Sequence, residues 1–437
     1  MKLRLLATSA AMALTTGLAG TAQAEDLTLC WAAWDPANAL VELSKEYEAQ
    51  SGNKMNFEFT PWPNFADRIQ NELNSGGKLC DLLIGDSQWI GGGAENGHYV
   101  KLNDFFDANG IKMADFMPAT VYAYSTWPKG SENYYALPAM ADANGWFYRK
   151  DWFARADLQA EFKAKYGRDL AEPKTQMELL DIAQFFQDRD IDGKKVYGAA
   201  IFTERGSEGI TMGITSALYA WGVKYENTPG KYDMEGAINS PAAIEAIEFY
   251  KKLYDTGTPP GYTNAYMGES LDAFKSGQVA MGMNWFAFFP GLAADPALKD
   301  KIDFFVNPPQ VTSGSTLGGQ GISVVSYSEH QEAALDYIKW FAQADVQSKW
   351  YKLGGFSAAN SVVNDPSFPT SSPFAGDFLE AMKNVQDFWQ EPAYAELLLA
   401  MQSRMHDYVV AGKGTAKEAL DGLVADWTEV FKEEGKL

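Results

Sequence analysis

The chain of 437 residues carries 57 acidic residues against 36 Lys and Arg, which gives a net charge of −21 at pH 7. This charge repels nucleic acid and anionic lipid, and it argues against an anionic ligand unless a local basic pocket overrides it. The length exceeds what one hydrophobic core usually serves, so we expect two lobes.

The first residues have the pattern of a secretory signal peptide. Lys2 and Arg4 provide the positive start, residues 5–19 are apolar, and residues 22–24 form the A-x-A pattern that signal peptidase cuts. The alternative is a membrane anchor, but the apolar run is shorter than the roughly 20 residues that a span requires. We therefore expect cleavage near Ala24 and a soluble protein in the periplasm whose mature chain begins near Glu25.

Strands and helices are predicted to alternate over the next part of the chain. The predicted elements are a strand over 27–33, a helix over 35–51, a strand over 55–60, a helix over 64–75 and a strand over 82–84. Asp35-Pro36 opens the first helix, because proline suits the first helical position. This alternation predicts a mainly parallel sheet flanked by helices, with ligands bound beyond the carboxyl ends of its strands.

Helical patterns dominate the rest of the chain, interrupted by short strands. The predicted helices cover 175–186, 210–221, 241–255, 331–342, 392–410 and 416–432, and the predicted strands cover 196–202, 279–283, 304–306 and 322–326. A glycine-rich turn at 318–321 is expected before the last strand. We find no internal repeat, and we predict a two-lobed α/β protein whose chain crosses between lobes more than once.

Of the two cysteines, Cys30 falls in the strand predicted over 27–33, and Cys80 opens the stretch 80–84 that contains the strand predicted over 82–84. Pairing of these strands could bring the two cysteines together. Export into an oxidising compartment permits a disulfide between them. Two separate buried thiols are the alternative, since the separation of the Cα atoms cannot be read from the sequence.

Aromatic and polar side chains stand together at successive predicted loops. A sugar ring offers an apolar face, which flat rings cover, and a rim of hydroxyls, which amides and carboxylates bind. The loops therefore suggest a carbohydrate cleft, although each Trp could instead belong to a core. The candidates for stacking are Trp34, Trp62, Trp89, Trp146, Trp221 and Trp285, and the amides beside them are Gln88 and Asn284.

Four acidic residues are candidates for binding hydroxyl groups, because a charged acceptor forms the stronger hydrogen bond. They are Asp35, Asp86, Asp142 and Glu204. Asp35 has the alternative role of a helix cap, and Asp86 that of holding a turn. Paired carboxylates also serve glycosidases, so a secreted glycoside-acting enzyme is the alternative function.

Several motifs, in their order along the chain, resemble a known family. They are Tyr135-Ala136-Leu137-Pro138, then Gly145 to Asp151, then Phe274-Lys275-Ser276-Gly277-Gln278-Val279-Ala280-Met281, and then Gly318 to Ser326. This succession resembles the extracytoplasmic solute-binding proteins of ATP-driven sugar importers, the family that includes maltose-binding protein. The second motif departs from the family pattern, since Arg149 stands where Asn is usual.

The resemblance implies a periplasmic binding protein fold with a hinge, closure on a carbohydrate, and delivery to the permease subunits of a membrane importer. It implies lobes made of residues 25–140 with about 315–345, and of 141–314 with about 346–437. It supports Asp86, Asp142, Glu204 and Trp285 as contacts, and it adds the Gly319-Gln320 turn and Arg404. We expect a monomer without cofactor, metal or catalytic activity; a chemoreceptor-coupled role would differ only in the partner.

Overall fold

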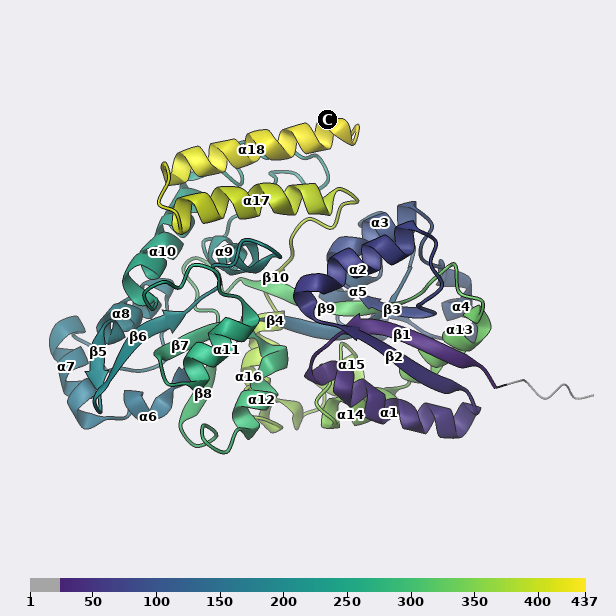
Figure 1. Cartoon of the computed structure of the whole chain (residues 1–437), viewed down its shortest axis with the longest axis horizontal. Helices are drawn as coiled ribbons and strands as arrows, with labels where there is room; N and C mark the ends of the chain where they lie inside the picture. Colours follow the sequence, from purple (N-terminus) through teal and green to yellow (C-terminus); the bar gives the residue numbers. More distant parts are fainter. Residues whose placement is uncertain (1–23) are drawn as a thin grey trace, which may run out of the picture.

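The computed structural model describes residues 24–437. The predicted signal peptide, apart from its last residue Ala24, lies outside the described residues. Figure 1 shows two bodies of strands and helices, which we call the first and the second lobe. The first lobe carries β1 to β3, and the second carries β5 to β8. Two long strands, β4 and β9, connect them across the middle of the molecule.

The sheet of the first lobe has the order β2-β1-β3-β9-β4. Its parallel strands are β1 (Asp26–Ala32), β2 (Lys54–Thr60) and β3 (Leu82–Gly85). β9 (Ser315–Val324) runs antiparallel to β3, and β4 (Leu137–Arg149) runs antiparallel to β9. The strands β1 to β3 are joined by α1 (Asp35–Ser51) and α2 (Trp62–Asn74). A proline in its first turn starts α1, and Gly52 in the left-handed conformation ends it.

The sheet of the second lobe is built on the end of β4. Residues 144–149 pair antiparallel with β7 (Val279–Trp285) and β8 (Ile302–Val306), while β6 (Lys194–Ala200) runs parallel to β7 and forms a hairpin with β5 (Arg189–Ile191). Helices pack around this sheet, namely α8 (Gln176–Phe186), α9 (Gly209–Ala220), α10 (Pro241–Gly257) and α11 (Met267–Lys275). Thr175 caps α8 by accepting the backbone N–H of Glu178.

The remaining helices flank both lobes. They are α3 (Ile90–Glu95), α4 (Asn103–Asn109), α5 (Pro118–Tyr124), α6 (Lys150–Phe153), α7 (Ala156–Tyr166), α12 (Phe289–Ala294), α13 (Gln331–Phe341), α14 (Ala344–Lys352), α15 (Asn360–Val363), α16 (Ala375–Met382), α17 (Tyr394–Val409) and α18 (Ala416–Glu433). Over residues 24–437, no helix combines the length and the apolar character that a membrane crossing requires.

The chain crosses between the lobes more than once, as the sequence predicts. The strands β4 and β9 make the first two crossings, and the third follows the two-residue strand β10 (Val385–Gln386), which pairs with the start of β9.

The expected turn at 318–321 is wrong, because these residues lie within β9 and pair with β4, where Gly319 is opposite Ala141. The pairing register shifts between Pro138 and Met140, so the ladder continues past an irregularity rather than ending in a turn.

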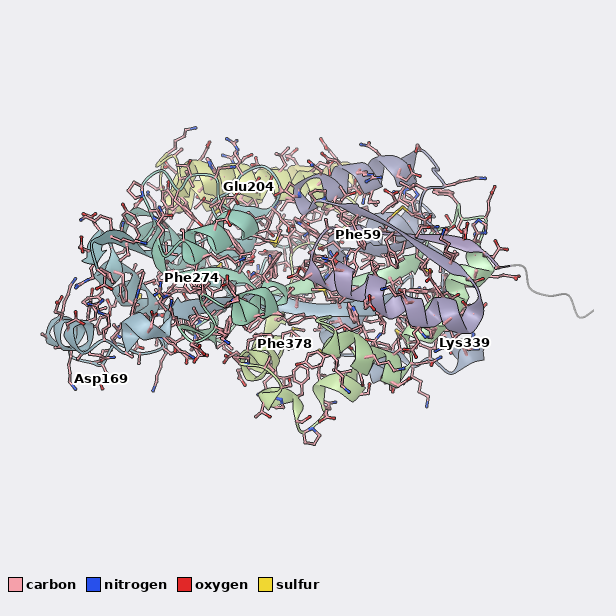
Figure 2. The ribbon with its side chains drawn as sticks, turned by 60° about the horizontal axis from the view of Figure 1, so that its bottom comes forward. Phe59, Asp169, Glu204, Phe274, Lys339 and Phe378 are labelled. Carbon is pink, nitrogen blue, oxygen red and sulfur yellow. A yellow bond between two sulfur atoms is a disulfide. The ribbon has the colours of Figure 1, made fainter. Side chains whose placement is uncertain are left out.

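Two clusters of buried apolar side chains form the cores. The first cluster includes residues 346–382, which the sequence assigns to the second lobe, because α14 packs on α1 and α16 packs on β4. Phe274 of α11 and Phe378 of α16 both belong to this cluster, which therefore extends into the second lobe (Figure 2). The helices α17 and α18 belong to the second cluster.

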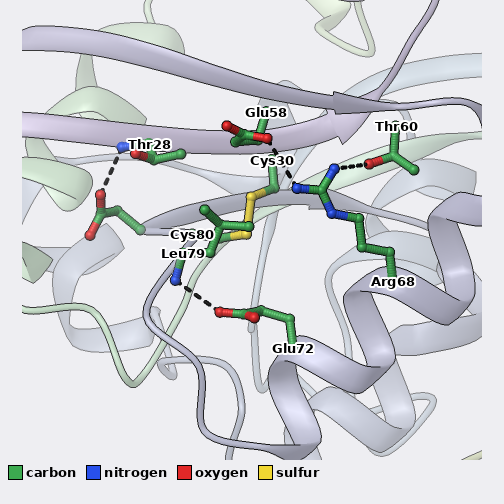
Figure 3. Close-up of a disulfide and its surroundings, with 9 residues drawn as sticks. Thr28, Cys30, Glu58, Thr60, Arg68, Glu72, Leu79 and Cys80 are labelled. Atoms are coloured by element: carbon green, nitrogen blue, oxygen red, sulfur yellow. Dashed lines mark hydrogen bonds and ion pairs between the residues drawn. A yellow bond between two sulfur atoms is a disulfide. The ribbon is translucent and has the colours of Figure 1, made fainter.

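A disulfide joins Cys30 and Cys80, whose Cα atoms lie 5.7 Å apart, so the structure contains the bridge rather than two thiols (Figure 3). It links β1 to the segment that enters β3. Beside it, Arg68 of α2 donates to the Thr60 hydroxyl over 2.8 Å and pairs with Glu58 over 3.0 Å. The bridge and these contacts hold the α1–β2–α2 unit against the centre of the first sheet.

Candidate functional site

A cavity lies where the two lobes meet. Its walls are formed by Trp34, Trp62, Asp86, Gln88, Asp142, Glu208, Met212, Tyr266, Met267, Trp285, Leu317, Gly318, Gly319, Gln320 and Asp387. The first four of these residues follow the carboxyl ends of β1, β2 and β3, which is where open α/β sheets place their ligands. The second lobe supplies the segment before α9, the start of α11 and the end of β7.

Three indole rings form the apolar part of the wall. The rings of Trp34 and Trp62 lie 6.3 Å apart and are tilted by 30°, and Trp34 also contacts Phe288 of the second lobe at 6.1 Å. Trp285 lies against Gly318, where an added Cβ would stand 2.6 Å from two atoms of the ring. A residue without a side chain is therefore needed at position 318 to admit the ring.

Glu208 connects the two lobes through its carboxyl group. It accepts hydrogen bonds from the Trp62 indole over 2.9 Å and the Gln88 amide over 3.3 Å, both from the first lobe. From its own lobe it accepts the Tyr266 hydroxyl over 2.7 Å, and that hydroxyl oxygen accepts the Trp285 indole N–H over 3.3 Å. One carboxyl group thus fixes the orientation of aromatic side chains on both sides of the cavity.

The other carboxyl groups of the wall are held by neutral donors. Asp142, which is 1% exposed, accepts the backbone N–H of Ala143 over 2.8 Å and of Ala287 over 3.2 Å. Asp86 accepts the Ser87 hydroxyl over 3.0 Å and the backbone N–H of Gln88 over 3.2 Å.

Burial raises the pKa of all four carboxyl groups in the wall. Desolvation is the largest cause for Asp86, Asp142, Glu208 and Asp387. The nearby charges of Glu208 and Asp387 raise the pKa of Asp86 further. The cavity is therefore a place where a negative charge is costly unless a bound group offsets it.

Comparison with known proteins matches residues 33–348 to bacterial extracellular solute-binding proteins. The chain belongs to this family. A probable ABC transporter-binding protein of Deinococcus radiodurans is 24% identical over 384 residues, which are 86% of this chain and 86% of the relative. The diacetylchitobiose binding protein of Streptomyces coelicolor is 22% identical over 336 residues, which are 75% of this chain and 70% of the relative.

Solved structures of solute-binding proteins share the fold. The tagatose-bound protein of Thermotoga lettingae superposes with a TM-score of 0.79 at 21% identity, over 93% of this chain and all of that one. The ribitol-bound protein of Agrobacterium radiobacter superposes with a TM-score of 0.77 at 23% identity, over 93% of this chain and 98% of that one. These likenesses confirm the predicted two-lobed α/β fold. The relatives and the neighbours are binding proteins.

Most of the residues predicted for the site of this solute-binding protein line one cavity. These are Trp34, Trp62, Asp86, Gln88, Asp142, Trp285, Gly319 and Gln320. Asp86 combines both roles considered for it, since it lines the cavity and also accepts the N–H that starts the short turn Ser87–Trp89.

Three predicted residues lie near the cavity without lining it. Asp35 is the exposed first residue of α1 and makes no capping hydrogen bond with its side chain. Trp89 is 4% exposed and stacks on Trp62 from behind. The carboxyl group of Glu204 accepts the backbone N–H and hydroxyl of Ser207, over 2.7 and 2.9 Å, so it holds its own loop (Figure 2).

The other candidates have structural surroundings. Trp221 packs on Phe249 in the second core, and Trp146 stacks on Phe305. Asn284 is fully buried and donates to the Met267 carbonyl over 3.0 Å, which positions the start of α11. Arg404, which the resemblance placed at the cleft, instead pairs with Asp426 between α17 and α18 over 2.7 Å.

The sequence analysis missed several residues of the wall, above all Glu208, Tyr266 and Asp387. Glu208 lies directly before α9, so an acid ahead of a predicted helix was an available signal. Asp387 follows a strand of only two residues, which leaves no periodic pattern in the sequence.

Proposed function

We propose that this protein is the periplasmic substrate-binding component of an ABC importer. It binds a carbohydrate, meaning a sugar, a glycoside or a polyol, between its lobes and delivers it to the permease subunits. The family membership supports transport, and the ligands of similar proteins, among them diacetylchitobiose, ribitol and tagatose, support the ligand class.

The observation that carries the ligand class is the composition of the cavity wall. Indole rings of Trp34, Trp62 and Trp285 face the same space as four carboxyl groups and the amides of Gln88 and Gln320. Flat rings cover the apolar face of a sugar, and the carboxyl and amide groups match its hydroxyls. A small ligand that has both an apolar face and several hydroxyl groups therefore fits this cavity wall.

Closure of the lobes around the ligand is the proposed mechanism. Trp34, Trp62 and Asp86 come from the first lobe, and Glu208 and Trp285 come from the second, so a bound ligand stabilises the closed arrangement. The proposed first lobe consists of residues 25–140 with about 315–345, and residues 346–382 contact both lobes, since α14 packs on α1 and α16 packs on β8. The second lobe consists of 141–314 and the remainder of the chain.

A thermal-shift screen of the mature protein against a broad carbohydrate panel tests the ligand class, followed by calorimetry of the compounds that raise the melting temperature. We expect at least one strong ligand, and the absence of both shift and heat would contradict the proposal. X-ray scattering with this ligand should show a smaller radius of gyration than without it. An unchanged radius at saturation would contradict closure.

We also propose that the protein does no chemistry on its ligand. The alternative, a glycoside-acting enzyme, requires an acid and a second carboxylate at a defined separation across the bond. A chromogenic glycoside panel separates the two functions. Product formation that Asp86→Asn or Asp142→Asn abolishes would favour the enzyme.

A further inference from the structure

The charged groups of the cavity wall all have the same sign. Asp86 comes from the first lobe, Asp142 from the crossing strand β4, Glu208 from the second lobe and Asp387 from the segment after β10. Among the described residues that line this cavity, none is Lys, Arg or His. The wall therefore presents four acids from four separate elements and no basic side chain.

The partners of these acids are neutral. Asp142 is bound by backbone N–H groups, Asp86 by a hydroxyl and a backbone N–H, and Glu208 by an indole, an amide and a phenol. Such donors stabilise a carboxylate but bring no positive charge.

Lys129 lines an adjoining cavity together with Asp387, and its positive charge lowers the pKa of that carboxyl group. Its ammonium group donates to the carbonyls of Tyr122 and Ala123 over 2.9 Å each, and burial lowers its pKa to about 7. This lowered pKa weakens the positive charge that Lys129 offers near neutral pH, so it compensates the acids only in part.

We propose that the physiological ligand carries a protonated amine on a polyhydroxylated frame, as an amino sugar or an amino polyol does. The inference rests on the proposed function and specifies the ligand class within it. The ammonium group supplies the positive charge that the four acids lack, and the indole faces of Trp34, Trp62 and Trp285 favour a cation as well.

Two further observations fit an organic cation of this kind. The buried indole N–H of Trp34 has no acceptor among the described residues, and a ligand hydroxyl oxygen can accept it. Within residues 24–437, no three acidic, His or Cys side chains are grouped closely enough to hold a metal ion.

The test compares ligands that differ only in the amine. D-Glucosamine is paired with D-glucose and with N-acetyl-D-glucosamine, and 1-amino-1-deoxy-D-sorbitol is paired with D-sorbitol, each titrated by calorimetry at neutral pH. In at least one series the amine should bind about tenfold or more tightly than its neutral partners. Titration in two buffers of different ionisation enthalpy should also show proton release, because an ammonium ligand lowers the raised pKa values of the acids.

Variants test whether the carboxyl groups of the cavity wall cause the preference for an amine ligand. Asp86→Asn and Asp387→Asn should each reduce the ratio of amine to neutral affinity about threefold or more, while the exposed Asp104→Asn on α4 should leave it unchanged. A neutral sugar or polyol that binds more tightly than every amine probe would overturn the inference but leave the proposed function intact. Failure of every compound in the panel to bind would overturn both.

Discussion

Gly318 offers a way to move one aromatic wall of the cavity without removing it. In Gly318→Ala the new Cβ would stand 2.6 Å from Cε3 and Cζ3 of Trp285, whereas carbon atoms pack best at about 3.5–4.0 Å. The indole must therefore shift by about 1 Å. Trp285 itself lines the cavity, so we expect its ring to yield into the space that the ligand needs.

The expected cost is larger for binding than for stability. Overpacking in a closed core lowers the free energy of unfolding by about 1–3 kcal/mol. Because the Trp285 ring can move toward the cavity, we expect a loss of stability at the lower end of this range. The displaced ring loses its contact with the ligand, which costs about 1–3 kcal/mol, or about ten- to hundredfold in affinity.

The assay measures the melting temperature and the dissociation constant for the tightest ligand from the screen. Gly268→Ala on α11 is the matched control, because its added Cβ would meet no atom within 4 Å although Met267 beside it lines the cavity. The control should bind as the wild type does. A Gly318→Ala protein with a much lower melting temperature and unchanged affinity would refute the placement of Trp285 at the ligand.

Three further predictions concern affinity, pH and the disulfide. Trp285→Ala should weaken binding about ten- to hundredfold and also lower stability, since the ring is 7% exposed and belongs to the second core; unchanged calorimetric affinity would contradict its role. Burial beside two other carboxyl groups raises the pKa of Asp377 from 3.8 to about 7, so the folded state holds this proton more tightly than the unfolded state. Its stabilising contribution is complete below the unfolded pKa and is lost as the pH rises to about 7. As the pH rises from about 4 to about 7, the melting temperature of Asp377→Asn should therefore increase relative to that of the wild type. A difference in melting temperature that does not change with pH would refute the assignment. Replacing Cys30 and Cys80 by Ser opens a loop with a sequence separation of 50, which should lower the free energy of unfolding by about 2–4 kcal/mol in denaturant titration; an unchanged midpoint would contradict this.

The fold was largely predictable where local patterns and tertiary structure agree. Proline at the start of α1, the capping Thr175 of α8 and the alternation of strands in the first lobe were all visible in the sequence. The crossing strand β4 was not, because it is almost entirely buried and mixes polar residues such as Asp142 and Asn144 with apolar ones, so its sequence does not sustain a period of two. The glycines of β9 similarly suggested a turn, yet they pair with β4, and Gly319 does so with a positive φ of 116° that favours glycine.

The site was predictable where a strand end identifies it. Trp34, Trp62 and Asp86 follow β1, β2 and β3, so the parallel sheet itself brings them together. The remaining wall depends on how the second lobe faces the first, and Glu208 and Asp387 enter it only through that arrangement. Residue type alone gave a wrong candidate for the wall, because Glu204 carries the same carboxyl group as Glu208 but binds the backbone of its own loop.

The position of β9 has a consequence for the order in which the molecule can fold. This strand is inserted between β3 and β4, although it is made long after both. Until it is synthesised, β3 and β4 expose unpaired edges, which are prone to wrong association. The first lobe therefore cannot mature before the second has been almost entirely translated, and slow assembly from distant segments follows. Such a delay would suit the export that we propose, in which the polypeptide crosses a membrane before it acquires its native form.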